Sequence, residues 1–142
     1  MVPQRPADLR RYYEAVAKRA GYRCEYCLAP EVFFVFRFTL DHVIPKSRSG
    51  ATSLANLSLC CPACQQQKQA FTRGWDSVFQ STALLFNPRR QRWSVHFRWS
   101  QDGLQIEGIT ATGRATVERL TLNSQRQVAA RSLWLNHPDL FP

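Results

Sequence analysis

Apolar side chains recur at helical spacing close to the N-terminus of the chain. Between residues 8 and 20 they repeat every three or four positions, as Leu9, Tyr12, Tyr13, Val16 and Ala17. Gly21 follows this segment, and glycine commonly ends a helix. The pattern therefore predicts a helix over residues 8–20.

A run of β-branched and aromatic residues comes next. Residues 32–40 form this run and predict a strand that leads directly to Asp41 and His42. Pro45 ends the strand or confines it to a sheet edge. The polar stretch over residues 46–53 predicts a surface loop.

A short apolar segment over residues 57–60 precedes a second predicted helix. That helix covers residues 61–73, which are rich in glutamine and lysine. Pro62 suits the first turn of a helix, where a missing N–H costs nothing, and Gly74 would end the helix.

Strict alternation of apolar and polar residues marks the second half of the chain. Residues 93–99 alternate in this way and predict a half-buried strand. Asp102–Gly103 predicts a hairpin turn, and residues 104–107 the returning strand. The aromatic residues of this segment could stack on bases, but their alternation favours a place in the core.

Helix capping predicts the last element. Ser124 and Gln127, three positions later, form a capping box for a helix over residues 125–135. Together these patterns predict an α+β protein with one domain over residues 1–142. An N-terminal helix would flank its core on one side, and a C-terminal β-hairpin and helix extension over residues 85–142 on the other.

The charge balance points to a polyanionic partner. The 142-residue chain has 19 Lys and Arg against 10 Asp and Glu, a formal net charge of +9. Such an excess is typical of proteins that contact nucleic acid. There is no apolar run of about 18 residues, as a membrane span requires, and no apolar core of a signal peptide. We expect no membrane partner, a cytoplasmic protein and reduced thiols.

Two CxxC pairs dominate the candidate chemistry. Cys24 with Cys27 and Cys61 with Cys64 can each direct two thiolates at one ion, and zinc takes four such ligands tetrahedrally. Reactive thiols and buried small hydrophobes are the alternatives. Four cysteine ligands leave no open position for water, so this zinc would be structural. Cys60 is expected to pack in the core.

Further polar motifs lie between and after the two cysteine pairs. Over about residues 20–72 the chain resembles the four-cysteine branch of the HNH endonucleases in Cys24-Glu-Tyr-Cys27, Asp41-His42-Val-Ile-Pro45, Asn56-Leu57 and Cys61-Pro-Ala-Cys64-Gln65-Gln-Gln-Lys68. The spacing from His42 to Asn56 and Gln65 is also similar to that of the HNH domain in CRISPR effector nucleases. The resemblance implies a ββα-metal fold (the HNH, or His-Me finger, core) that holds one divalent cation.

The same resemblance assigns roles to four residues. His42 would be the general base, Asp41 a ligand of the catalytic Mg²⁺ or Mn²⁺, and Asn56 a brace for the loop that holds the base. Gln65 would be the second metal ligand, although the family usually carries asparagine or histidine there. Glutamine keeps the amide oxygen on a longer side chain. Adjacent strand residues also point to opposite faces, so Asp41 and His42 share a site only if the backbone leaves the strand.

Basic residues around this segment complete the hypothesis. Lys68, Lys46, Arg48 and Arg73 could contact phosphate, although solvated positions are the alternative. The resulting function is hydrolysis of phosphodiester bonds, with DNA favoured over RNA. Two other functions stay open: a zinc-stapled DNA-binding module that has lost catalysis, and an interaction subunit of a nucleoprotein assembly.

Overall fold

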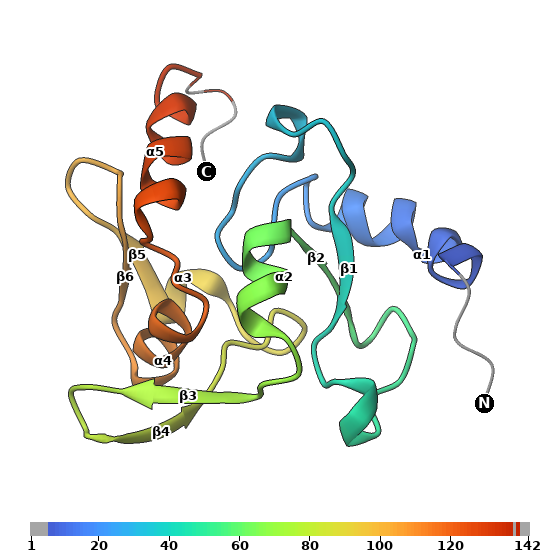
Figure 1. Cartoon of the computed structure of the whole chain (residues 1–142), viewed down its shortest axis with the longest axis horizontal. Helices are drawn as coiled ribbons and strands as arrows, with labels where there is room; N and C mark the ends of the chain where they lie inside the picture. Colours follow the sequence, from blue (N-terminus) through green and yellow to red (C-terminus); the bar gives the residue numbers. More distant parts are fainter. Residues whose placement is uncertain (1–5, 138, 140–142) are drawn as a thin grey trace.

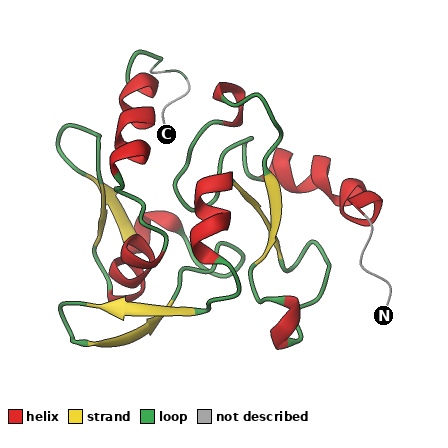
Figure 2. Ribbon diagram, viewed as in Figure 1, coloured by secondary structure: helices red, strands yellow, loops and turns green. Residues whose placement is uncertain are grey.

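The computed structural model describes residues 6–137 and 139 (Figure 1). Within this part of the chain the elements, in order, are α1 (Pro6–Arg19), the 3-10 turn η1 (Glu31–Phe33), β1 (Thr39–His42), the 3-10 turn η2 (Lys46–Arg48), β2 (Leu57–Cys60), α2 (Pro62–Lys68), β3 (Arg73–Asp76), β4 (Ser81–Leu84), α3 (Trp93–His96), β5 (Phe97–Trp99), β6 (Ile106–Gly108), α4 (Ala111–Arg119) and α5 (Gln125–Trp134). The strands form three separate antiparallel pairs among the helices (Figure 2). The predicted α+β class is confirmed.

The ββα unit lies at the centre of the molecule. β1 pairs with β2 in a register that runs from Thr39 opposite Cys60 to His42 opposite Leu57. α2 follows β2 directly, and α1 packs beside the pair (Figure 1). The guanidinium of Arg19, at the end of α1, donates hydrogen bonds to the carbonyl oxygens of Leu54 and Leu57. The N-terminal helix is therefore tied to the second strand of the unit.

The strand predicted over residues 32–40 is wrong for most of its length. β2 offers only four partners, so residues before Thr39 have no strand to pair with. The carboxylate of Glu31 accepts hydrogen bonds from the Phe38 N–H and the Tyr13 hydroxyl, which holds the segment as a loop. Apolar side chains of this loop face solvent, with Val35 94% and Phe36 80% exposed.

The helix predicted over residues 61–73 is also too long. α2 ends at Lys68 because Gln69 adopts a positive φ of 49°. Arg73 belongs instead to the β3–β4 hairpin, which the sequence patterns did not predict. Gly74 allows this hairpin to approach α4, since a Cβ there would lie 2.7 Å from the Ala115 carbonyl oxygen.

The predicted strand over residues 93–99 divides into a helical turn and a strand. α3 covers its first four residues and β5 the last three. The turn brings the indole N–H of Trp93 to the carbonyl oxygen of Tyr26 at 2.9 Å. β5 then pairs with β6 as the predicted hairpin requires, and Ser124 caps α5 by accepting from the Gln127 N–H. The hairpin and the last helix are confirmed.

The buried core extends through both halves of the chain. It joins Leu57 and Leu59 of β2 with Phe86, Phe97 and Trp134 of the second half. None of the helices in the described part of the chain has both the length and the hydrophobicity needed to cross a lipid bilayer. The second half therefore packs against the ββα unit and positions it.

Candidate metal and hydrolytic site

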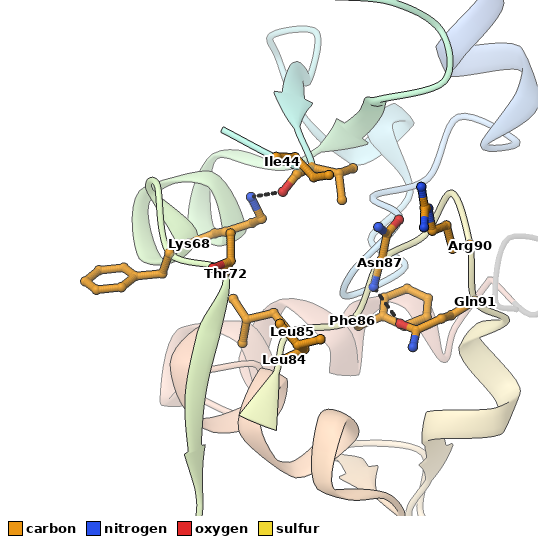
Figure 3. Close-up of a pocket in the computed structure, with 11 residues that line it drawn as sticks. Ile44, Lys68, Thr72, Leu84, Leu85, Phe86, Asn87, Arg90 and Gln91 are labelled. Atoms are coloured by element: carbon orange, nitrogen blue, oxygen red, sulfur yellow. Dashed lines mark hydrogen bonds between the residues drawn. The ribbon is translucent and has the colours of Figure 1, made fainter. Parts of the chain in front are cut away.

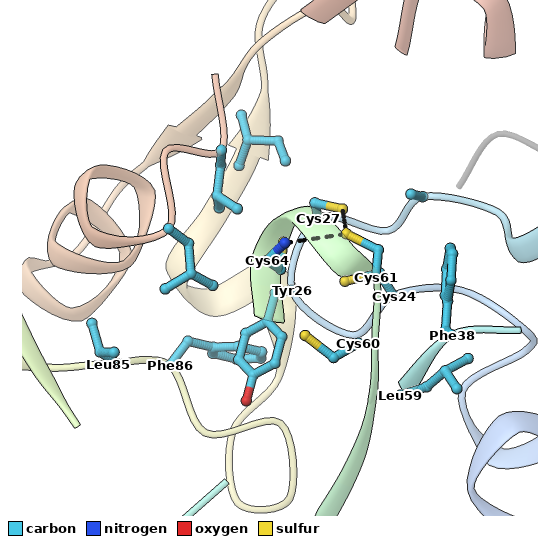
Figure 4. Packing of buried hydrophobic residues seen from close by; sticks show 14 of the residues in the cluster. Cys24, Tyr26, Cys27, Phe38, Leu59, Cys60, Cys61, Cys64, Leu85 and Phe86 are labelled. Carbon is cyan, nitrogen blue, oxygen red and sulfur yellow. Dashed lines mark hydrogen bonds between the residues drawn. The ribbon is translucent and has the colours of Figure 1, made fainter. Parts of the chain in front are cut away.

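The four paired cysteines converge on one buried point. The Sγ atoms of Cys24, Cys27, Cys61 and Cys64 all lie within 4.8 Å of one another, and those of Cys27 and Cys61 are 3.6 Å apart. Figure 4 shows them inside the core. They lie where the turn from Cys24 to Cys27, which we call the first knuckle, meets the start of α2. Zinc–sulfur bonds of about 2.3 Å in a tetrahedron place sulfur atoms about 3.8 Å apart. The cluster therefore fits a structural zinc ion.

Local backbone geometry and charge both prepare this cluster. Cys61 is the N-cap of α2, and its sulfur accepts from the Cys64 N–H at 3.4 Å. Burial opposes ionisation of Cys24, but hydrogen bonds from the neighbouring thiols lower its pKa well below the usual value. Cys60 is buried beside the cluster and is not one of the four converging residues, as predicted.

The C-terminal half also reaches this cluster. The Gln127 amide of α5 donates to the Cys64 sulfur at 3.8 Å. Arg89 forms an ion pair with Glu25, inside the first knuckle, and the Glu25 carboxylate accepts from the Leu59 N–H. The cysteine spacing predicted the four ligands, but no pattern in the sequence indicated these supporting contacts.

Asp41 lies at the centre of a buried polar network. Its carboxylate accepts from the Tyr26 hydroxyl at 2.8 Å and pairs with the Lys68 ammonium at 3.1 Å. Burial raises the pKa of Asp41, while Lys68, Tyr26 and Gln65 oppose that shift. The carboxylate is thus held by an ion pair and by two neutral donors.

Gln65 lies beside Asp41, with its amide nitrogen toward the carboxylate. The Nε2 atom donates to Asp41 Oδ1 at 3.4 Å, while Oε1 accepts from the Thr39 hydroxyl at 3.3 Å. A half-turn of the terminal amide would exchange the two atoms and give up the hydrogen bond to Asp41. The residue can then present oxygen toward Asp41.

His42, the next residue of β1, lies with Asp41 at the surface of a depression. An open depression of about 380 Å³ is lined by Asp41, His42 and Gln65, together with Lys46. The ring Nε2 lies 2.8 Å from the Thr52 hydroxyl. Burial lowers the pKa of His42, and Lys46 lowers it further, so the neutral imidazole is favoured.

The backbone stays in β1 through Asp41 and His42, with the Asp41 side chain buried and that of His42 half-buried. The expected departure from the strand does not occur at this point. Asp41 and His42 nevertheless reach one depression because it lies at the edge of the β1–β2 pair, beside α2.

Asn56 braces the loop that follows His42. Its side chain accepts from the Ile44 N–H and donates to the carbonyl oxygens of Ile44 and Ala51, each at 2.9 Å. Three hydrogen bonds from one amide close the loop between β1 and β2. Two of these bonds hold the backbone of Ile44, two residues after His42.

The predicted phosphate contacts lie in different places. Lys46 lines the depression, and Arg48 is exposed on η2. Arg73 is exposed on β3 and donates to Thr82. Lys68 does not fit the prediction: it is 1% exposed, and its ammonium also donates to the carbonyl oxygens of His42 and Val43. Burial of Asp41 requires a cation there, so this lysine points inward.

The fold and the site define an α+β metalloprotein with a ββα core beside a four-cysteine cluster. Residues 24–71 match the family model of the HNH endonucleases, and this segment includes the four cysteines, β1, β2 and α2. No curated protein and no solved structure gives a significant match. The family supports a nuclease-like or nucleic-acid-binding role.

We predict that the protein binds one zinc ion per chain through the four converging cysteines. Cys61→Ala should abolish zinc binding, whereas Cys60→Ala, which removes the adjacent buried thiol, should retain it. Metal analysis of both purified variants gives the stoichiometry. Equal zinc content in the two variants would contradict the assignment.

The buried ion pair predicts a large effect on stability. Lys68→Met should lower the free energy of unfolding by about 3–5 kcal/mol, since it leaves the Asp41 carboxylate buried without a cation. The exposed Arg98–Glu107 pair offers the matched control, and Arg98→Met should cost about 1 kcal/mol or less. Urea unfolding of the zinc-loaded proteins measures both. Combining Lys68→Met with Asp41→Asn should recover part of the loss.

Proposed function

We propose that the protein is a metal-dependent endonuclease that hydrolyses phosphodiester bonds of nucleic acid, with DNA as the favoured substrate. The observation that supports this function is the shared depression lined by Asp41, His42 and Gln65 inside the HNH segment. The net charge of +9 suits a polyanionic substrate. His42 is the proposed general base.

The donor set suits a hard divalent cation. Octahedral Mg²⁺ with oxygen ligands at about 2.1 Å places neighbouring oxygens about 3.0 Å apart. The Asp41 carboxylate and the Gln65 amide lie 3.4 Å apart, so both fit one ion once the amide turns its oxygen inward. Bound there, Mg²⁺ or Mn²⁺ would stabilise the charge that develops on the phosphate and the leaving oxygen.

Other residues around the depression have separate proposed roles in the reaction. A neutral His42 accepts a proton from the attacking water, and Thr52 and the Asn56-braced loop orient its ring. Lys68 holds the Asp41 carboxylate in place from the buried side. Lys46, at the rim of the depression, carries positive charge where a phosphate would enter.

A second candidate is a zinc-stapled module that binds nucleic acid without cutting it. The orientation of Gln65 favours this function, because its amide nitrogen, and not its oxygen, faces Asp41. Lys68 already neutralises the same carboxylate. Both features weaken the attraction of a second cation.

We predict that His42→Ala lowers the rate of plasmid cleavage in Mg²⁺ or Mn²⁺ by about 10²- to 10⁴-fold, the usual contribution of a general base. His96→Ala is the matched control, because His96 also bonds a threonine hydroxyl, that of Thr110, and lies outside the HNH segment. It should retain full activity. A wild-type protein that binds DNA in a salt-dependent way and never cleaves it would favour the second candidate.

Variants of Gln65 test its place as a metal ligand. Gln65→Asn should give equal or higher activity, because asparagine has a shorter side chain and is a usual residue of the HNH endonucleases at this position. Gln65→Ala should raise the Mg²⁺ concentration for half-maximal cleavage on the order of tenfold or more. Gln66→Ala removes the adjacent exposed amide of α2 and should change nothing. The hypothesis fails if Gln65→Ala and Gln66→Ala show the same metal dependence.

A further inference from the structure

The outer face of the β3–β4 hairpin is exposed and carries an arginine beside a tryptophan. Alternate residues of a strand share one face, so Arg73 and Trp75 point outward together with their cross-strand partners Leu84 and Thr82. All four are exposed, Trp75 by 43% and Leu84 by 57%. We call these four residues the outer hairpin face.

Packing on the other side keeps this face outward. Gly74 lies against α4, and Asp76 is buried in an ion pair with Arg114 of the same helix at 2.7 Å. Rotation of the hairpin would break that pair and bring Trp75 against the α4 backbone. The exposure of Trp75 is therefore imposed by the fold.

Trp75 differs from the other tryptophans of the chain. Trp93 and Trp99 form a tilted ring pair with centroids 5.4 Å apart, and Trp134 is buried in the core. Within the described residues the indole of Trp75 makes no aromatic pair, no cation–π contact and no side-chain hydrogen bond. A large flat ring is thus presented to solvent on a rigid element.

The surroundings of this ring are basic and aromatic. Asp76 is the one acidic residue between positions 71 and 86, and it is buried and paired. The guanidinium of Arg119 lies 3.9 Å from the centre of the Phe71 ring, at the start of the hairpin. An unpaired strand of nucleic acid combines negative charge with flat rings and therefore matches this surface.

A cavity lies between the outer hairpin face and the loop that follows His42. Leu84 and Phe71 line a cavity of about 310 Å³ together with Ile44 and Lys68, and Figure 3 shows Leu84 across the cavity from Ile44. The wall residue Val43 follows His42 directly in the chain. A strand that leaves the outer hairpin face through this cavity would therefore reach the loop that follows His42.

We propose that the outer hairpin face and this cavity bind an unpaired strand of nucleic acid, with a base stacked on Trp75 and a phosphate held by Arg73. This inference deepens the proposed nuclease function, because it names the form of the substrate beside the site. Bases of a duplex are stacked on each other, so only an unpaired strand offers its ring faces to Trp75.

Binding of a fluorescein-labelled oligothymidylate to the zinc-loaded protein, without added Mg²⁺ or Mn²⁺, tests the proposal. Trp75→Ala should weaken binding by about 5- to 100-fold, the range for loss of one base–aromatic stack. Binding to the wild type should quench its tryptophan emission, because a base stacks on Trp75. Trp75→Phe keeps a stacking ring and should bind nearly as well, but most of this quenching should be lost. Phe36→Ala, which removes an exposed aromatic ring on a different loop, should bind like the wild type.

Three results would overturn the proposal. In the first, Trp75→Ala and the wild type bind the oligonucleotide with equal affinity. In the second, the protein binds a duplex more tightly than the single strand, and Trp75→Ala does not change the affinity for the duplex. In the third, the wild type is a dimer that Trp75→Ala dissociates, while the oligonucleotide affinity is unchanged. Plasmid cleavage by the wild type is scored separately. Cleavage with normal binding by Trp75→Ala refutes only this inference, whereas binding through Trp75 without any cleavage refutes the nuclease and leaves the inference standing.

Discussion

The convergence of four cysteine sulfurs is the constraint on which the rest of the structure depends. Cys24 and Cys27 precede the first strand of the ββα unit, and Cys61 and Cys64 open its helix. Bringing these points together closes a loop of the chain around β1 and β2. A two-stranded hairpin is marginal in water, so this pair requires the cluster and the packing of neighbouring helices.

That constraint also determines where the polar site forms. Tyr26 lies inside the first knuckle and donates to Asp41, while Lys68 lies at the end of α2 and pairs with the same carboxylate. The knuckle and the helix thus supply the two partners that allow an acidic group to be buried. The second half of the chain supports the arrangement from outside through Trp93 and Gln127.

Predictions from the sequence succeeded where local chemistry decides the outcome. The CxxC pairs predicted the thiolate cluster, and the serine cap predicted the start of α5. In each case a few neighbouring residues carry the whole physical cause.

Predictions failed where a distant partner decides. The apolar run over residues 32–40 has strand propensity, but β2 is too short to pair with it. Lys68 resembles an exposed helix lysine until Asp41, 27 positions earlier, is placed beside it.

The sequence alone predicted the resemblance of residues 24–71 to the HNH endonucleases and the convergence of the four cysteines, because both depend on residue type and spacing. Tertiary structure decided which groups are buried, which way Gln65 turns and which face carries Trp75. Burial and orientation depend on contacts between segments that are far apart in the chain, and hydrophobic periodicity contains no information about such contacts.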